Sequence, residues 1–329
     1  MLVLSAEDVR QALPMAMAIE AMKRAFAALS DGRAVVPPRA HVPVEAHDGV
    51  SLVMPALVAD ADGEALAVKV VSLFDGNPER GLARIQVAVL AFDPETGRPL
   101  ALLEGATLTA LRTGAASGAA TDLLARPDSR AVGVLGAGAQ ARTQLEAVCT
   151  VRHIETVRVY DPRPGAAEAF RAEMAGHGPV PADVRAAPSP REAVAEADIL
   201  CAATTAREPA FDDADLPPGT HINAIGSYQP DVQELPAATV ARALVIVDSR
   251  EAALEETGDL IQPIRQGLFG PDHIHAELGE LVLGRASGRT SPEQLTVFKS
   301  VGVAVQDAAA ARAALSEARR LGLGQTVRW

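Results

Sequence analysis

A glycine-rich turn lies between an apolar strand and a helix near the middle of the chain. The predicted strand 131–135 runs into Gly-Ala-Gly-Ala-Gln-Ala at 136–141, which matches the pattern G-x-G-x-x-G/A. The first glycine of this pattern makes a tight turn, the second lets a pyrophosphate approach the backbone, and the small last residue lets helix pack on strand. A helix over about 142–149 points its first N–H groups at the phosphates. The candidate cofactor-binding residues of the turn are Gly136, Gly138, Ala139 and Gln140.

An acidic residue follows the next predicted strand, 157–160. Asp161 lies 23 residues after Gly138, a spacing that suits a carboxylate accepting hydrogen bonds from the hydroxyls of the adenosine ribose. A carboxylate there repels a 2′-phosphate and favours NAD over NADP, whereas Arg163 offers a cation that would accept NADP. The turn and this acid together predict a dinucleotide site. The alternative is a small-residue turn in an α/β domain that binds no ligand.

Three cations stand at unusual places in the N-terminal third. Arg39 follows two prolines, which hold its backbone extended, and Lys69 interrupts an apolar strand. Arg112 lies in a helix of otherwise uncharged small and apolar residues. Each also has an ordinary interpretation, as a loop charge, an edge-strand charge that blocks aggregation, or a helix-surface residue.

The segments that carry these cations predict a small α+β domain. Apolar residues at 15, 19, 22, 26 and 29 share one helical face, so a core-facing helix is expected there. Strand-like runs follow at 66–74, 85–92 and 100–103, with a turn signal at 93–97. Because no helix separates the last two runs, antiparallel pairing is expected.

From about residue 107 the pattern changes to that of a parallel sheet. An Ala-rich helix is predicted over 108–124, and near-continuous apolar strands then alternate with helical stretches, which is typical of a sheet covered on both faces. The proline-rich stretch 176–190 is expected to be a surface loop, and a helical stretch is expected after Ser291-Pro292, to about Leu321. The predicted strands are 131–135, 157–160, 199–203, 221–225 and 244–247.

Composition excludes several classes of protein. The chain has 329 residues, a net charge of −12, 48% hydrophobic residues and 3% aromatic residues. An acidic chain that is poor in aromatics lacks both the basic face and the stacking platforms that nucleic-acid binding requires. Two cysteines fit a reducing compartment, and we find neither a signal-peptide pattern nor an apolar run that would span a membrane. A cytoplasmic location is therefore expected.

Several motifs together resemble the ornithine cyclodeaminase/μ-crystallin family over almost the whole chain. The resemblance implies an α/β fold in which a Rossmann-type parallel-sheet domain, 114–304, is inserted into a smaller α+β domain for substrate binding and dimerisation, 1–113 plus 305–329. It also implies a homodimer. The motifs are Leu-Thr-Ala-Leu-Arg-Thr-Gly-Ala-Ala-Ser at 108–117, Val-Leu-Gly-Ala-Gly-Ala-Gln-Ala at 134–141, Ile-Asn-Ala-Ile-Gly at 222–226, Ala-Glu-Leu-Gly-Glu at 276–280 and Thr-Val-Phe-Lys-Ser-Val-Gly at 296–302.

The resemblance also assigns roles to individual residues. Arg39, Lys69 and Arg112 match the family's set for the substrate carboxylate, and an arginine fork suits that group geometrically. For Lys299 the alternative is a solvated helix charge. The residues that match positions lining the cofactor in the family are Arg112, Thr113, Thr204, Ile225 and Lys299.

Activities in this family include ornithine cyclodeamination, alanine dehydrogenation and the reduction of cyclic imino acids. Ornithine cyclodeaminases that resemble this chain carry an aspartate where Tyr228 stands, and a tyrosine with an ordinary pKa of about 10 is no substitute as a base. Asp231 matches the ketimine-reducing members instead. The resemblance therefore favours NAD(P)H-dependent reduction of Δ1-pyrroline-2-carboxylate or Δ1-piperideine-2-carboxylate to proline or pipecolate, a role in proline metabolism.

Lys69 or a bound water is the candidate proton donor to the imine nitrogen. Alanine dehydrogenation, cyclodeamination and a non-enzymatic binding role, as in lens μ-crystallins, remain the alternatives. His273-Ile274-His275 has the form of a metal-ligand pair, but no further ligands stand nearby and we predict no metal site. The expected partner is a small imino or amino acid, with neither nucleic acid nor membrane.

Overall fold

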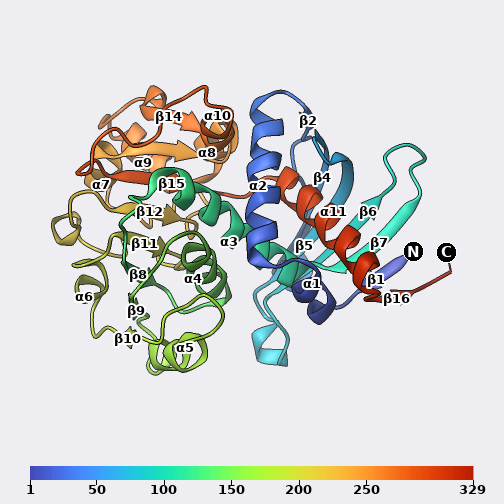
Figure 1. Ribbon diagram of the computed structural model, residues 1–329, viewed down its shortest axis with the longest axis horizontal. Helices are drawn as coiled ribbons and strands as arrows, with labels where there is room; N and C mark the ends of the chain where they lie inside the picture. Colours follow the sequence, from blue (N-terminus) through green and yellow to red (C-terminus); the bar gives the residue numbers. More distant parts are fainter. Residues whose placement is uncertain (329) are drawn as a thin grey trace. The chain divides into compact units, whose positions relative to one another are not determined.

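The computed structural model describes residues 1–328 and divides the chain into two compact units (Figure 1). Unit 1 comprises residues 1–112 and 303–329, and unit 2 comprises residues 113–302. Helix α3 (Gly105–Leu124) contributes to both units. None of the helices among the described residues is both long and apolar enough to cross a membrane. The predicted fold class, a parallel-sheet α/β domain together with an α+β domain, is confirmed.

Unit 1 is built on an eight-stranded sheet in the order β16-β1-β7-β6-β5-β4-β2, with β3 also paired to β4. Its pairs are antiparallel except β1 with β7, which is parallel. The sheet is larger than the sequence patterns predict. They do not predict the twelve-residue strand β4 or the short strands β1, β2, β3 and β16. The strands are β1 (Leu2–Leu4), β2 (Ala34–Val35), β3 (Ala40–Val44), β4 (Gly49–Asp60), β5 (Gly63–Phe74), β6 (Ile85–Phe92), β7 (Pro99–Glu104) and β16 (Gln325–Thr326).

Three helices of unit 1 pack on the sheet and on one another: α1 (Ala6–Ala12), α2 (Met15–Ser30) and α11 (Ala304–Leu321). Ser5 caps α1 through the backbone N–H of Asp8, and the apolar face predicted for α2 is buried. On the sheet, the cross-strand row Met54, Lys69, Val89, Leu103 is buried. Successive residues of a strand point to opposite faces, so a polar ammonium at Lys69 lies in an otherwise apolar row beneath the helices.

The opposite face of this sheet is also apolar. Its rows alternate with the buried ones and stay only partly buried. One row is Pro55, Val68, Leu90 and Leu102, and the next is Leu57, Leu66, Phe92 and Pro99. The central strands thus carry apolar side chains on both faces of the sheet, which indicates that both faces are covered in the folded protein.

Unit 2 is a wholly parallel eight-stranded sheet in the order β10-β9-β8-β11-β12-β15-β13-β14. The chain order reverses between β8 and β11, which is the place where open α/β sheets bind dinucleotides. The strands are β8 (Ala131–Leu135), β9 (Thr156–Tyr160), β10 (Val184–Ala186), β11 (Ile199–Ala202), β12 (His221–Ala224), β13 (Leu244–Val247), β14 (Ile274–Glu277) and β15 (Thr296–Lys299).

The helices of unit 2 are mostly short. α4 follows the glycine turn and packs on β8 and β11, while α5 packs on β9 and β10. The helices are α4 (Ala139–Val151), α5 (Ala166–Met174), α6 (Pro190–Val194), α7 (Ala237–Arg242), α8 (Arg250–Glu256), α9 (Gly258–Arg265) and α10 (Leu278–Val282). Short 3-10 helices occur at Glu45–His47, Pro78–Arg80, Asp213–Asp215 and Pro271–His273.

Two predictions about local structure are wrong. The stretch 176–190, expected to be a loop, contains the edge strand β10 and the first residue of α6. The helical stretch expected after Ser291-Pro292 is preceded by strand β15, and the helix α11 begins only at Ala304. Strand β15 has only four residues, and over so short a run the spacing of apolar residues does not distinguish a strand from the start of a helix.

Candidate active site

The three predicted substrate cations all belong to unit 1, where the strand register places Arg39 and Lys69 at the same level of the sheet. Met54 of β4 pairs with Lys69 of β5, and Ala40, the residue after Arg39, pairs with Val53. Arg39 therefore enters β3 at the level of Lys69. Arg112 comes from α3 and is only 5% exposed, against 3% for Lys69.

A buried carboxylate joins two of these cations. Asp307, in the first turn of α11, lies 2.6 Å from Lys69 Nζ through Oδ2 and accepts a 3.0 Å hydrogen bond from Arg112 Nε through Oδ1. Gln306 Oε1 accepts from Arg112 Nη1 at 2.8 Å and from the backbone N–H of Val303 at 2.9 Å. Gln306 thus caps α11 and orients Arg112, and the first turn of one helix positions two cations.

The charges of this cluster act on one another strongly. Burial lowers the pKa of Lys69 to about 8; the guanidinium groups of Arg112 and Arg39 lower it as well, and the Asp307 carboxylate opposes them. Burial also disfavours ionised Asp307, but Arg112 and Lys69 outweigh burial and hold the pKa of Asp307 below its usual value. The carboxylate is therefore charged at neutral pH, and Lys69 is a cation that loses its proton only slightly above neutral pH.

The cluster retains binding capacity for an anion. An ammonium has three N–H donors and a guanidinium has five. The contacts with Asp307 and Gln306 use one donor of Lys69 and two donors of Arg112. Two positive charges on Lys69 and Arg112 face one negative charge on Asp307. The excess positive charge, in a low-dielectric setting, suits a small carboxylate.

The glycine turn of unit 2 has the geometry that a dinucleotide needs. Gly136 has φ +90°, and a Cβ there would lie 2.5 Å from the carbonyl oxygen of Ala203, so only glycine fits. Around Gly138 a Cβ would meet nothing within 4 Å, which leaves room for a phosphate beside the backbone. Gly138 is the N-cap of α4 and has no side-chain cap; Ala139 and Gln140 open this thirteen-residue helix. Its first N–H groups are suited to phosphate oxygens.

Asp161 connects the glycine turn to the end of β9. Its Oδ2 accepts from the backbone N–H of Ala137 at 2.8 Å. Arg163 donates to the same carboxylate through its backbone N–H, Nε and Nη2, each at 2.9 Å, and this bonding lowers the pKa of Asp161 to about 2. The Arg163 side chain is 68% exposed. A ribose at Asp161 must therefore compete with a long, exposed arginine side chain that is itself able to meet a phosphate.

The other predicted cofactor residues lie at different depths in unit 2. Thr204 and Ile225 follow β11 and β12 at the carboxyl edge of the sheet, and Thr113 is buried beside α4, where its carbonyl accepts from Gln144 at 3.2 Å. Lys299 ends strand β15 with 1% exposure and pairs with Asp259 at 2.9 Å. The alternative that Lys299 is a solvated helix charge is therefore wrong.

Tyr228 and Asp231, from which the sequence predicts the activity, lie on the surface of unit 2. Tyr228 is 44% exposed, and Asp231 forms an ion pair with Arg207. His273 and His275 each lie within hydrogen-bond distance of a backbone carbonyl, those of Val240 and Ser287. Among residues 1–328 no three metal-ligating side chains gather into a group.

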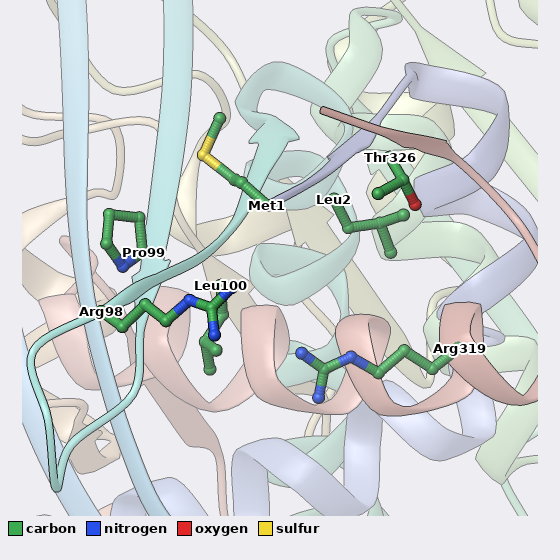
Figure 2. Close-up of a pocket in the computed structure, with 7 residues that line it drawn as sticks. All are labelled: Met1, Leu2, Arg98, Pro99, Leu100, Arg319 and Thr326. Carbon is green, nitrogen blue, oxygen red and sulfur yellow. The ribbon is translucent and has the colours of Figure 1, made fainter. Parts of the chain in front are cut away.

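A cavity of about 300 Å³ lies elsewhere in unit 1, beside β1, β7 and the end of α11 (Figure 2). Its charged side chains are Arg98 and Arg319, and the seven residues that line it include none of the predicted site residues. The cation cluster around Asp307, not this cavity, is therefore the candidate substrate site.

Comparison with known proteins decides the family. The model of the ornithine cyclodeaminase/mu-crystallin family matches residues 1–320. The chain belongs to this family. It is 43% identical to a Δ1-pyrroline-2-carboxylate reductase of Bacillus cereus over 329 residues, 99% of each chain.

Solved structures of this family agree with the assignment. The Δ1-pyrroline-2-carboxylate reductase of Thermococcus litoralis, in complex with NADH and L-proline, matches with a TM-score of 0.93 and 46% identity over 99% of this chain and 100% of that one. An archaeal alanine dehydrogenase dimer with bound NAD matches with a TM-score of 0.91 and 34% identity over 100% and 99%. The predicted resemblance to the ornithine cyclodeaminase/mu-crystallin family is confirmed.

Sequence reasoning about this family member missed Gln306 and Asp307. They lie 194 and 195 residues from Arg112, so no local pattern links them. One signal was available: Gln-Asp is a polar pair at the head of the otherwise Ala-rich segment 304–314. A buried acid in such a segment needs a cationic partner.

Proposed function

We propose that the protein is an NAD(P)H-dependent reductase of a cyclic imino acid, Δ1-pyrroline-2-carboxylate or Δ1-piperideine-2-carboxylate, yielding L-proline or L-pipecolate. The observation that carries this proposal is the buried cluster of Lys69 and Arg112 on Asp307, with its excess positive charge. Such a cluster suits a substrate that is small and carries one carboxylate. The similarity to two Δ1-pyrroline-2-carboxylate reductases supports the same substrate class.

In this reaction the cation cluster both binds and protonates. Arg112 and Arg39 hold the carboxylate, and Asp307 keeps Arg112 and Lys69 in place. Lys69, with a pKa of about 8, gives its proton to the imine nitrogen, since a donor is most effective when its pKa is close to the working pH. Bound at Gly136, Gly138 and Asp161, NADH would supply the hydride to the imine carbon. One hydride and one proton convert C=N to CH–NH.

The proposal is tested by following NADH and NADPH oxidation with each cyclic imine. Pyruvate plus ammonia and ornithine alone serve as competing substrates. We expect oxidation with the imines and a loss of at least about tenfold in kcat/KM for Arg112→Ala, which is about 1.4 kcal/mol of transition-state stabilisation. Arg10→Ala, on the exposed surface of α1, is the matched control. No oxidation with either imine, together with proline formed from ornithine, would overturn the proposal.

A second candidate is alanine dehydrogenation, which the likeness to the archaeal alanine dehydrogenase favours. The same carboxylate site and the same hydride chemistry would serve the imine of pyruvate. The pyruvate arm of the assay decides between them: a higher kcat/KM with pyruvate and ammonia than with either cyclic imine would support the second candidate.

For the cofactor we propose NAD, with NADP accepted less well. The Asp161 carboxylate, already placed on the glycine turn by Ala137, favours free ribose hydroxyls over a 2′-phosphate. Asp161→Ala is expected to raise the Kd for NADH at least about tenfold, as expected for the loss of hydrogen bonds to a charged group. The Kd for NADPH is not expected to rise, because the substitution also releases Arg163. Binding is measured by the change in NAD(P)H fluorescence.

The chain offers a matched control for this experiment. Asp183, the residue before β10, accepts hydrogen bonds from Nε and Nη2 of Arg185, each at 2.6 Å, with the same two-residue spacing. Asp183→Ala is expected to leave both affinities unchanged. An equal loss of NADH and NADPH binding in Asp161→Ala would contradict the ribose role.

We propose that the protein is a homodimer whose subunits meet through the open face of the unit 1 sheet. The row through Val68 and Leu90 and the next row, through Leu66 and Phe92, are apolar and only partly buried within one chain. Such a face is suited to a second copy of itself. Leu90→Glu is expected to convert the dimer to a monomer in light scattering at micromolar concentration. Leu321→Glu, at an exposed position of α11, the helix that packs on the opposite face of this sheet, is expected to stay dimeric; a dimeric Leu90→Glu would argue against this face.

We propose a cytoplasmic location for the protein. Cys149 and Cys201 are both free and buried, and free cysteines are ordinary in a reducing compartment. Burial also raises the pKa of the Cys149 thiol to about 12, which makes it an inert, hydrophobic side chain.

A further inference from the structure

Glu234 is a fully buried acid in the segment between β12 and α7. Its Oε1 accepts hydrogen bonds from the backbone N–H of Thr204 at 2.6 Å and from Thr204 Oγ1 at 2.8 Å. Its Oε2 accepts from the backbone N–H of Gly226 at 2.8 Å. One carboxylate thus holds two separate loops by three donors.

These two loops lie at the functional edge of the unit 2 sheet. Thr204 follows β11 and Gly226 follows β12, which are adjacent parallel strands. The end of β11 is in turn bonded to the end of β8, because Ala203 N–H donates to Leu135 O at 3.0 Å. Glu234 therefore fixes the backbone on the β11–β12 side of the place where the strand order reverses, while the glycine turn and Asp161 lie on the β8–β9 side.

The approach of the loops is close. A Cβ on Gly226 would lie 2.2 Å from Glu234 Oε1 and 2.4 Å from Thr204 O, so no other residue fits at 226 without displacing the carboxylate. The packing and the hydrogen bonds therefore enforce one arrangement of the two loops.

Glu234 is itself anchored by α9, and through it by strand β15. Asp259 Oδ1 accepts from the backbone N–H of Glu234 at 2.6 Å and of Leu235 at 2.9 Å, and its Oδ2 lies 2.9 Å from Lys299 Nζ. Lys299 ends β15, which pairs with β12. Glu234, Asp259 and Lys299 are all at most 1% exposed, so the described contacts of Lys299 connect it to Glu234 through Asp259.

We propose that Glu234 is a positioning residue for the nicotinamide half of the dinucleotide. It sets the loops at Thr204 and Gly226 against which that ring and its ribose lie, and it leaves the adenosine half, held at the glycine turn and Asp161, unaffected. This inference rests on the proposed function, because it presumes a dinucleotide that crosses the sheet at the reversal point. A carboxylate is required since all three of its partners donate, and an amide would set one N–H against another.

The test compares NADH with ADP-ribose, which has the adenosine and pyrophosphate but no nicotinamide. Glu234→Gln is expected to raise the Kd for NADH at least about tenfold and to lower kcat at saturating NADH by a similar factor, because a buried backbone N–H loses its hydrogen-bond acceptor. The Kd for ADP-ribose, measured by calorimetry, is expected to stay within about twofold. Glu293→Gln, exposed and at the amino end of β15, is the matched control and is expected to change none of these.

A second variant covers a failure of Glu234→Gln to fold. Thr204→Val removes one donor to Glu234 at nearly constant volume, and the same pattern is expected with smaller losses. Equal losses of NADH and ADP-ribose affinity in a folded variant would contradict the inference, because Glu234 would then support the whole dinucleotide site and not the nicotinamide half. Unchanged NADH affinity and unchanged kcat would contradict it as well. If wild-type protein reduces no cyclic imine, the proposed function fails, but the two binding measurements still decide the role of Glu234.

Discussion

Asp307→Asn is expected to lower kcat/KM for the cyclic imino acid by about 100-fold, or ~2.7 kcal/mol of transition-state stabilisation. The substitution keeps the shape of the side chain and removes the only negative charge that Lys69 and Arg112 share through their described contacts. Without it the two cations repel each other in a buried setting. Because Asp307 is the group that opposes the lowering of the pKa of Lys69, Lys69 becomes neutral at working pH and loses both its attraction for the carboxylate and its proton.

The same variant is expected to be less stable by about 3 kcal/mol, since removing one partner of a buried ion pair leaves an uncompensated charge. Steady-state kinetics and denaturant unfolding measure the two effects separately. Glu317→Gln is the matched control on the same helix, where Glu317 pairs with Arg320 at the surface, and it is expected to leave kcat/KM unchanged. A value of kcat/KM within about twofold of wild type in Asp307→Asn would exclude the carboxylate as the organiser of the site.

The pH dependence of the reaction is expected to report Lys69 directly. With a pKa of about 8, Lys69 is protonated at neutral pH, so kcat/KM is expected to fall about tenfold per pH unit above pH 8. Lys69→Arg keeps the charge at all these pH values and is expected to lose that descending limb. Because ionisation of the free substrate is the same for both proteins, the difference between the two profiles belongs to Lys69; identical profiles would contradict its role.

Stability should move in the opposite direction over the same range. The pKa of Lys69 falls from 10.5 to about 8 on folding, so between these values the unfolded chain binds a proton that the folded chain has released. The unfolding free energy then rises with pH across this window through Lys69. Activity that declines while stability increases would distinguish deprotonation of Lys69 from unfolding at high pH.

Local patterns predict those parts of the candidate site that depend on backbone geometry. A glycine turn needs particular residues at fixed spacing, so Gly136, Gly138 and Asp161 were visible in the sequence. Lys69 stands out in the sequence because its ammonium interrupts a run of apolar strand residues. Strand β10, of three residues in a proline-rich stretch, gave no such signal, since pairing with β9 and not propensity makes it a strand.

Contacts between distant segments could not be predicted in this way. Asp307 meets Lys69 only because α11 packs on β5, and Glu234 meets Thr204 only because two loops converge at one sheet edge. The Ala-rich segment around Asp307 indicates that this acid needs a cationic partner, but neither acid has a local sequence signal that identifies its partner. The strand that ends in Lys299 was missed for a related reason, because burial between β12 and β13 makes those four residues a strand.

Because the ribosome synthesises the chain from its N-terminus, unit 1 cannot finish folding until its last segment has been made. Lys69 and Arg112 are synthesised well before their counter-ion, because Asp307 emerges 195 residues after Arg112. At about 5–20 residues per second this delay is roughly 10–40 s, during which the sheet lacks α11 and its charged row lacks a carboxylate. Unit 2 is made entirely within that interval. The nascent chain must therefore complete its second unit before its first can close, and chains released early carry an unshielded apolar face that chaperones would have to cover.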